Sequence, residues 1–317
     1  MRKMHKFWYL EIEVKLKSKL NVFKIKLGGE RMKINWFPGH MAKALKMMGE
    51  EVKKVDVIIY VLDSRAPFSC VNPSFLKVIG NKPIIYILNK CDMVDAGELK
   101  QWQVGIAKSS NCKVLPMNAT ESNASKVIES CVNELMKGKV DWYLSKGAKI
   151  TLRAMIIGVP NSGKSTLANN LNGKSKAVTG NKAGVTRTKQ WIKIGKYMEV
   201  LDTPGTLWPN LENNETALNL AFIGSIKEEV LDRNELALAL VEKLIKIDSA
   251  CLIERYGIEI GEKTPLETLD AIASAKAFKL KGGDIDYDRV CQMILNDYKK
   301  GKLTNKILDN VECVKCF

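Results

Sequence analysis

The stretch Gly158-Val159-Pro160-Asn161-Ser162-Gly163-Lys164-Ser165 fits the phosphate-loop pattern G-x-x-x-x-G-K-[ST] at every fixed position. An apolar run at 152–157 precedes it and a helix is expected over 164–172, which is the context that this motif needs. The glycines let backbone N–H groups face phosphate oxygens, and the start of the helix adds its positive dipole end. A glycine-rich turn with a chance Lys-Ser pair is the alternative. We expect the phosphates of a nucleotide to be bound by Asn161, Ser162, Gly163, Lys164, Ser165 and Thr166.

Strands and helices alternate on both sides of this loop. Apolar runs predict strands at 56–63, 83–88, 113–117, 152–157, 191–194 and 197–201, and helices are expected at 42–54, 122–137 and 164–172. This alternation is typical of an α/β protein with a doubly wound, mostly parallel sheet. After residue 208 only helical periodicity remains, at 216–223, 228–255, 265–278 and 286–300. We therefore predict an α/β domain at 32–207 and a small all-α domain at 208–317.

Residues 1–31 differ from the rest of the chain. They are basic, and 11–17 alternate as a strand would, but no clear hairpin partner follows. Met32 opens a segment that looks like a natural N-terminus. We expect 1–31 to be an extension from an upstream start or a non-native addition, mostly disordered.

The composition is that of a globular protein. The 317 residues have room for about two domains. Hydrophobic residues make up 46% and charged residues 27%, which excludes disordered, collagen-like and coiled-coil proteins. No apolar run reaches the roughly 18–20 residues that cross a bilayer, and a signal peptide is not evident. Eight cysteines without an export signal indicate reduced thiols, so we predict a cytoplasmic protein that binds no membrane.

The net charge of +15 is distributed unevenly. Residues 1–33 contribute +7, residues 34–207 contribute +12 and residues 208–317 contribute −4. A solvated lysine-rich surface explains this pattern as well as a binding role does. If the surface binds a large partner, that partner is expected to be a polyanion.

The motif Asn89-Lys90-Cys91-Asp92 follows the buried strand at 83–88. A carboxylate at Asp92 can accept hydrogen bonds from both N1–H and the exocyclic amine of guanine, whereas adenine offers no such pair of donors. Asn89 would brace this base site, and the stem of Lys90 would cover the ring. The motif alone could be a turn, but beside a phosphate loop it points to GTP or GDP.

A second guanine motif is expected at 118–120, again after a strand. Asn118 and Ala119 resemble the small-residue box whose backbone N–H contacts the guanine carbonyl oxygen. An ordinary loop is an equally good interpretation of these residues when they are taken alone.

The remaining motifs concern the phosphates and Mg²⁺. Lys164 is expected to reach the β- and γ-phosphates, and the Ser165 hydroxyl is expected to bind Mg²⁺. Asp202 ends a strand and would hold Mg²⁺ through water, and the N–H of Gly205 would sense the γ-phosphate. Thr186, in a basic loop, offers a second hydroxyl to Mg²⁺, although a plain turn threonine is the alternative.

The order of these motifs is unusual. In ordinary GTPases the phosphate loop comes first and the guanine motifs come last. Here the motifs at 89–92 and 118–120 precede the phosphate loop at 158–165 and the Mg²⁺ motif at 202–205. This circular permutation places the predicted all-α domain directly after the loop that senses the γ-phosphate, which favours a switch with 208–317 as its output.

With this order, the chain resembles the circularly permuted ribosome-assembly GTPases of the YlqF/RbgA type over about residues 32–308. Besides the motifs above, the matching residues are Trp36-Phe37-Pro38-Gly39-His40-Met41, Asp63-Ser64-Arg65-Ala66-Pro67, Trp208-Pro209, Gly282-Gly283-Asp284-Ile285-Asp286 and Asp297-Tyr298-Lys299-Lys300-Gly301-Lys302. The resemblance implies GTP hydrolysis coupled to late maturation of the large (50S) ribosomal subunit, with the all-α domain in contact with rRNA.

The catalytic set is less clear. Thr206 stands where many GTPases have a water-orienting Gln and where the relatives usually have an apolar residue. We therefore expect His40, with Lys164 and Thr186, to supply catalysis, because a neutral imidazole could position the attacking water. A capping or packing role is the alternative for His40. Asn161 occupies the position with which similar GTPases help to bind K⁺, and K⁺ there would replace an arginine finger.

The expected partner is the large ribosomal subunit, through its rRNA and proteins, with the chain acting as a monomer and binding no DNA. Basic clusters at 276–281 and 299–306 could contact phosphates. A GTPase acting on the small subunit or tRNA remains an alternative, as does an RNA-binding scaffold that holds nucleotide without useful turnover. Cys313 and Cys316 lack a second ligand pair, so we expect a frayed tail rather than a zinc site.

Overall fold

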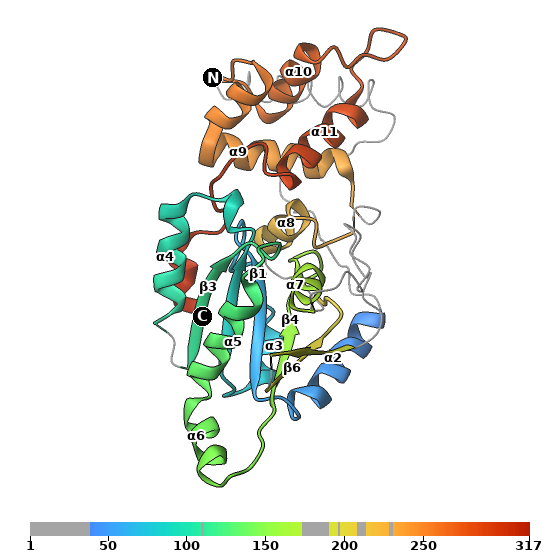
Figure 1. Cartoon of the computed structure of the whole chain (residues 1–317). Coiled ribbons are helices and arrows are strands. Elements are labelled where there is room, and N and C mark those ends of the chain that lie inside the picture. The colour runs from blue at the N-terminus through green and yellow to red at the C-terminus, as the bar shows by residue number, and fades with distance from the viewer. Residues whose placement is uncertain (1–38, 109–110, 173–189, 196, 208–213, 228–230) are drawn as a thin grey trace. The chain divides into compact units, whose positions relative to one another are not determined.

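The computed structural model describes residues 39–317, apart from 109–110, 173–189, 196, 208–213 and 228–230 (Figure 1). The predictions for 1–31, Thr186 and Trp208-Pro209 concern residues outside this described part. Residues 39–317 belong to one compact unit, and the domain division at residue 208 stays a prediction. In the described part, no helix has both the length and the apolar composition that a membrane span requires.

A six-stranded sheet with the order β3-β2-β1-β4-β6-β5 forms the centre of the α/β region. The strands are β1 (Val57–Asp63), β2 (Ile84–Asn89), β3 (Cys112–Met117), β4 (Leu152–Ile157), β5 (Gln190–Ile194) and β6 (Met198–Asp202). Neighbouring strands are parallel except for β5, which pairs antiparallel with β6 at one edge. The predicted doubly wound, mostly parallel sheet is therefore confirmed. Every residue of β1 is buried, which explains its continuous apolar sequence.

The register brings the motifs to one edge of the sheet. Asp63 of β1 is level with Asn89 of β2, and Asp202 of β6 is level with Ile156 of β4. The strand order reverses between β1 and β4, because β2 and β3 lie beyond β1 whereas β6 and β5 lie beyond β4. In open α/β sheets, ligands bind at such a switch point, outside the carboxyl ends of the strands. The motif after β2 precedes the phosphate loop after β4, so the circular permutation is confirmed.

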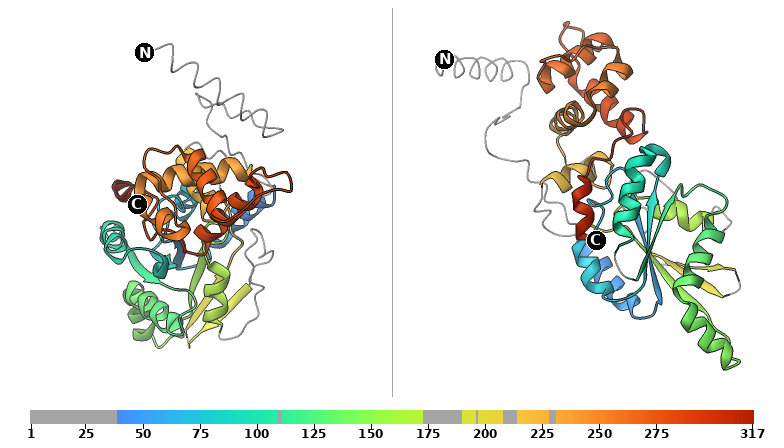
Figure 2. Two further views of the ribbon diagram at one scale, coloured as in Figure 1. Left: turned by 90° about the horizontal axis from the view of Figure 1, so that it is seen from above. Right: turned by 90° about the vertical axis from the view of Figure 1, so that its left-hand side faces the viewer.

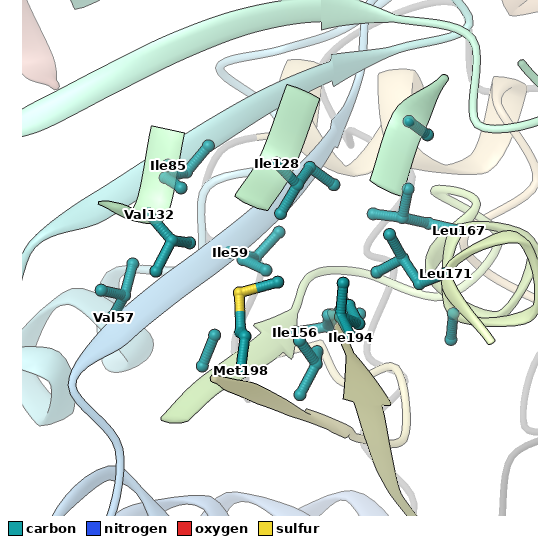
Figure 3. Close-up of a cluster of buried hydrophobic side chains, with 14 of the residues drawn as sticks. Val57, Ile59, Ile85, Ile128, Val132, Ile156, Leu167, Leu171, Ile194 and Met198 are labelled. Carbon is teal, nitrogen blue, oxygen red and sulfur yellow. The ribbon is translucent and has the colours of Figure 1, made fainter. Parts of the chain in front are cut away.

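Helices cover both faces of the sheet (Figure 2, right). On one face, α5 (Ala124–Leu135) and α7 (Lys164–Leu171) pack on alternate residues of the strands. This buried cluster includes Val57, Ile59, Ile85, Ile128, Val132, Ile156, Leu167, Leu171, Ile194 and Met198 (Figure 3). Burying a large aliphatic side chain contributes roughly 1.5–3 kcal/mol, so this cluster is a main source of stability for the layer that supports the phosphate loop.

The other face is covered in part by α3 (Pro73–Ile79), next to α2 (Gly39–Val52). Phe75 of α3 lies edge-on to Tyr60 of β1, with ring centroids 6.1 Å apart. The helix was expected to begin at residue 42, with His40 before it, but α2 begins at Gly39, so His40 lies in its first turn.

After β6 the described elements are mostly helices, namely α8 (Asn214–Phe222), α9 (Arg233–Tyr256), α10 (Pro265–Ala275) and α11 (Tyr287–Lys299). Both α10 and α11 pack on α9. The prediction of one helix over 228–255 is wrong in two respects. The helix begins at Arg233, because the Asp232 carboxylate accepts from the next backbone N–H groups as an N-cap, and its backbone is non-helical at Asp248.

The C-terminal tail is ordered against α4 (Ala96–Ile106). Residues Val311–Cys316 form a short 3₁₀-helix, and the Phe317 ring lies edge-on to Tyr86 at 5.4 Å and to Trp102 at 6.2 Å. The predicted frayed tail is therefore wrong. Its apolar residues find partners that are remote in sequence.

Candidate nucleotide-binding site

The phosphate loop connects β4 to α7 at the carboxyl edge of the sheet. Gly158 has φ 149°, and a Cβ built there would lie 2.4 Å from the carbonyl oxygen of Val61. Gly163 has φ 98°, and a Cβ there would lie 2.0 Å from Nδ2 of Asn89. Backbone conformation and lack of space therefore both require glycine at these two positions.

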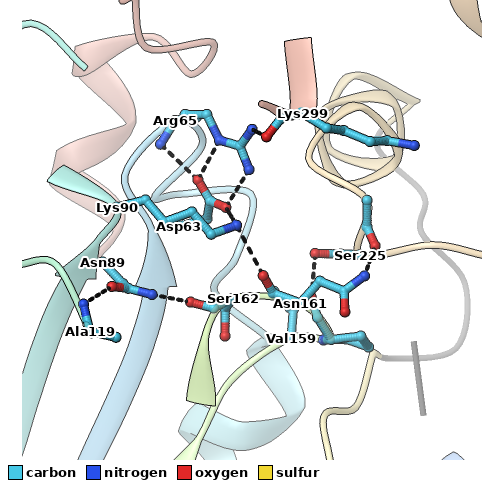
Figure 4. A network of polar contacts seen from close by, with 12 residues as sticks. Asp63, Arg65, Asn89, Lys90, Ala119, Val159, Asn161, Ser162, Ser225 and Lys299 are labelled. Atoms are coloured by element: carbon cyan, nitrogen blue, oxygen red, sulfur yellow. Dashed lines mark hydrogen bonds and ion pairs between the residues drawn. The ribbon is translucent and has the colours of Figure 1, made fainter. Parts of the chain in front are cut away.

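Asn89 joins the phosphate loop to the second guanine motif (Figure 4). Its Nδ2 donates to the carbonyl oxygen of Ser162 at 2.7 Å, and its Oδ1 accepts from the N–H of Ala119 at 2.8 Å. Asn89 is buried, so its amide binds protein rather than water. This one side chain holds together three segments that come from the ends of three strands.

Asp92 and Asn118 are the residues expected to bind guanine. Asp92 belongs to a short 3₁₀-helix, η1 (Cys91–Met93), and is exposed, so its carboxylate is accessible to a base. The Oδ1 of Asn118 accepts from the N–H of Thr120 at 3.0 Å and from its hydroxyl at 2.7 Å. The N–H of Ala119 is already donated to Asn89, so here it stabilises the framework of the site.

Lys90 connects the guanine side to the phosphate loop by a different route. Its backbone is left-handed, with φ 59°, and its Nζ donates to Oδ2 of Asp63 at 2.7 Å and to the carbonyl oxygen of Asn161 at 3.1 Å (Figure 4). Sequence reasoning assigned no role to Asp63. The available signal was its place at the end of the apolar run at 56–63.

Lys164 is buried beneath the loop, and its Nζ donates to the carbonyl oxygen of Val159 at 2.6 Å. Burial lowers the pKa of Lys164 to about 8, against the opposing influence of the Asp202 carboxylate. A Cβ at Gly205 would lie 2.8 Å from this Nζ. The loop after β6 therefore packs directly on the phosphate loop, as a sensor of the γ-phosphate requires.

Asp202 and Ser165 fit a magnesium ion. Asp202 is buried, which raises the pKa of its carboxyl, and its Oδ1 has no hydrogen-bond partner among the described residues. Ser165, in the first turn of α7, brings a hydroxyl oxygen, and Mg²⁺ prefers oxygen ligands. Mg²⁺ bound here would neutralise charge on the β- and γ-phosphates. Thr186, expected to supply the second hydroxyl, is not among the described residues.

Thr206 is not placed to orient water. Its side chain is buried, and its hydroxyl lies 3.8 Å from the Sδ of Met48 in α2. His40 lies in the first turn of that helix.

Residues that follow α8 also contact the phosphate loop. Nδ2 of Asn161 donates to the carbonyl oxygen of Gly224 at 2.5 Å, and the buried Ser225 hydroxyl donates to the carbonyl oxygen of Pro160 at 2.7 Å. Sequence reasoning missed both residues. A Gly-Ser pair after an apolar helix is typical of a helix end and gives no hint of a site.

Known proteins share these features. Residues 153–270 match the family described as "50S ribosome-binding GTPase". The chain is 39% identical over 282 residues to ribosome biogenesis GTPase A of Bacillus cereus, which covers 89% of this chain and 95% of the relative. It is 32% identical over 307 residues to mitochondrial ribosome-associated GTPase 1 of Ictalurus punctatus, which covers 89% and 94%.

A solved structure supports the fold. GNP-bound YlqF from T. maritima matches with a TM-score of 0.60 and 23% identity, over 84% of this chain and 99% of that one. The geometry of the phosphate loop and the match over nearly the whole length of these relatives both indicate a GTPase. The chain therefore belongs to the ribosome biogenesis GTPase A family and is a guanine-nucleotide-binding GTP hydrolase of ribosome biogenesis.

Proposed function

We propose that this GTPase binds the nascent large ribosomal subunit and hydrolyses GTP during its late assembly. The supporting observation is the contact of Gly224 and Ser225 with Asn161 and Pro160 of the phosphate loop. A change at the γ-phosphate can act on the segment from α8 onward through these hydrogen bonds. GTP favours a docked state in this scheme, and hydrolysis favours release.

The surface that meets rRNA is proposed to include both parts of the chain. Residues 34–207 have a net charge of +12, which suits a phosphate backbone. Residues 208–317 are acidic overall, but exposed lysines supply local positive charge there, namely Lys276, Lys279, Lys281, Lys300 and Lys302.

The direct test of this partner is co-sedimentation with purified subunits. We expect the protein to sediment with large subunits in the presence of a non-hydrolysable GTP analogue, and much less with GDP. Small subunits and tRNA serve as the matched alternatives. Preferential sedimentation with small subunits, or binding to tRNA alone, would contradict the proposal.

Hydrolysis is proposed to need help from the subunit. The buried Thr206 cannot orient water, so the described residues offer no complete catalytic set, and the basal rate is expected to be slow. We propose that His40 positions the attacking water once α2 docks on the subunit. His40→Ala should then abolish the stimulated rate and leave nucleotide affinity unchanged. A stimulated rate that survives this substitution would remove His40 from the mechanism.

We also propose that Mg²⁺ is required and is held through Ser165, Asp202 and Thr186.

A further proposal is that K⁺ binds at Asn161. If it does, hydrolysis should be faster in KCl than in NaCl at equal ionic strength. Asn161→Ala should remove this difference between the two salts. Equal rates of the unmodified protein in both salts would exclude the K⁺ site.

A further inference from the structure

The Asp63 carboxylate is fully buried at the end of β1 and is shared by two cations. Arg65 donates through Nε to Oδ1 at 2.9 Å and through Nη2 to Oδ2 at 2.7 Å, and Lys90 donates to Oδ2 at 2.7 Å (Figure 4). Burial alone would raise the pKa of Asp63, but the charges and hydrogen bonds of Arg65 and Lys90 hold it well below its usual value. The carboxylate is therefore ionised and bound on both sides.

Arg65 uses its remaining nitrogen to bind the end of α11. Nη1 donates to the carbonyl oxygens of Tyr298 at 3.3 Å and Lys299 at 3.2 Å, and the guanidinium carbon lies 5.5 Å from the centroid of the Tyr298 ring. The last carbonyls of a helix lack intrahelical donors, and a cation is favoured at this end of the dipole. Arg65 thus fixes the last turn of α11 to the carboxyl edge of the sheet.

Lys90 extends the same network into the nucleotide site. Its Nζ also donates to the carbonyl oxygen of Asn161 in the phosphate loop at 3.1 Å. A continuous path of direct contacts therefore leads from the phosphate loop through Lys90, Asp63 and Arg65 to α11. The distances between successive members of this path are those of hydrogen bonds and ion pairs.

The residues after α11 lie against η1, the short helix that contains Asp92 of the guanine motif. Gly301 has φ 67°, and a Cβ built there would lie 3.2 Å from the Cγ of Met93 in η1. The N–H of Gly301 donates to the same Tyr298 carbonyl that Arg65 binds, at 3.0 Å. The N–H of Lys302 donates to the carbonyl oxygen of Asp297 at 2.9 Å. The amides of 300–302 therefore report on the end of α11 that Arg65 holds.

We infer that Asp63 and Arg65 are positioning residues that couple occupancy of the guanine pocket to the last turn of α11. A bound base restricts the stem of Lys90, and Lys90 in turn restricts the Asp63–Arg65 pair. This path meets the Gly224 contact at Asn161, but it uses the backbone carbonyl of Asn161 rather than its side chain. It is expected to respond to the base rather than to the γ-phosphate. Only the assignment of α11 to a subunit-binding region rests on the proposed function.

The test is amide hydrogen exchange of the full chain, with and without saturating GDP. In the unmodified protein, GDP should slow exchange at 300–302 by roughly fivefold or more, the lower end of ordinary coupling between sites. Arg65→Lys keeps the charge but loses the planar fork that binds carboxylate and carbonyls together, so GDP should change exchange there by less than about twofold. Saturating GDP compensates for any loss of affinity.

Arg255→Lys is the matched control. Arg255 of α9 pairs with Asp297 of α11, the helix that Arg65 also binds, with Nε 2.9 Å from Oδ2. Arg255 does not touch Asp63. In the Arg255→Lys variant, GDP should slow exchange at 300–302 as much as in the unmodified protein. Equal loss of the effect in both variants would reduce Arg65 to a structural role and overturn the inference.

If Arg65→Lys does not fold, the double variant Asp63→Asn with Arg65→Gln removes both charges of the pair and leaves neither of them buried without its partner. It should also lose the effect of GDP, and a retained effect would overturn the inference. Unchanged exchange at 300–302 in the unmodified protein would overturn it regardless of any variant. No ribosomal subunit is present, so failure here is distinct from failure of the proposed function.

Discussion

The side-chain amide of Asn89 occupies the space beside the α-carbon of Gly163. A Cβ on Gly163 would lie 2.0 Å from Nδ2 of Asn89, and the same Nδ2 donates to the carbonyl oxygen of Ser162 at 2.7 Å. The guanine motif and the phosphate loop thus fit together through one amide. The absence of a side chain at Gly163 is as necessary to this joint as the hydrogen bond.

Replacing Gly163 by Ala should abolish tight nucleotide binding. The methyl group would displace Asn89, and a left-handed φ of 98° adds strain of roughly 1–3 kcal/mol. Gly138→Ala is the control, since an added Cβ there would meet no atom within 4 Å apart from its chain neighbours and the backbone of its own helix. Titration with a fluorescent GDP analogue would measure both affinities. Near-normal affinity of Gly163→Ala would contradict the arrangement described here.

Asp92→Asn should exchange guanine for xanthine specificity. The variant loses two charge-assisted hydrogen bonds from the guanine N1–H and amine, so GDP affinity should fall by at least about 100-fold. Xanthine has a carbonyl in place of the amine, which the new amide N–H can bind. Competition with GDP, XDP and ADP measures the change, with Asp141→Asn on the exposed face as control. A variant that still prefers GDP would show that Asp92 does not read the base.

Nucleotide affinity should depend on pH through Lys164. Its pKa of about 8 in the nucleotide-free protein means that the ammonium loses its proton as the pH passes this value. Phosphates favour the charged form and raise the pKa, so binding takes up a proton. Affinity should therefore fall as pH rises, by roughly fourfold between pH 7 and pH 8.5. Binding measured by calorimetry in two buffers should show this uptake, and any residual affinity of Lys164→Arg should be independent of pH.

Removing the ring of Phe317, which lies outside the nucleotide site, should destabilise the protein. The ring is half-buried and packs edge-on against Tyr86 and Trp102, so Phe317→Ala should lower the free energy of unfolding by about 1–3 kcal/mol. Val311→Ala, at a position 42% exposed in the same 3₁₀-helix, should change it by less than about 0.5 kcal/mol. Urea unfolding measures both, and equal values would indicate that the tail is not docked in solution.

Much of the fold could be predicted because its signals are local. The strand at 56–63 is a continuous apolar run, and it forms β1 at Val57–Asp63. Helices with weaker patterns could not be predicted. Helix α4 contains Gly97 and Gly105, which lower helix propensity, and it depends on packing with the C-terminal tail.

The boundary between α5 and α6 (Lys137–Ser145) illustrates a second limit. One helix was expected over 122–137, but α5 ends at Leu135 and α6 follows at once. Gly138 in α6 weakens the periodic signal at this junction. Patterns of a few residues predict that helices exist better than they predict where helices end.

The site shows the same division. Lys164, Ser165 and Asp202 could be singled out as candidate site residues because short motifs specify them. Arg65 could not be given a role, because its partner Tyr298 is 233 residues away, and only the folded chain brings them together.

The central claim is that GTP hydrolysis is coupled to the large ribosomal subunit. The most direct measurement is the rate of GTP hydrolysis in KCl by the purified protein alone, with large subunits and with small subunits. The account predicts slow hydrolysis by the protein alone, strong stimulation by large subunits and none by small subunits. A rate that is unchanged by large subunits, or that is raised equally by both subunits, would contradict it.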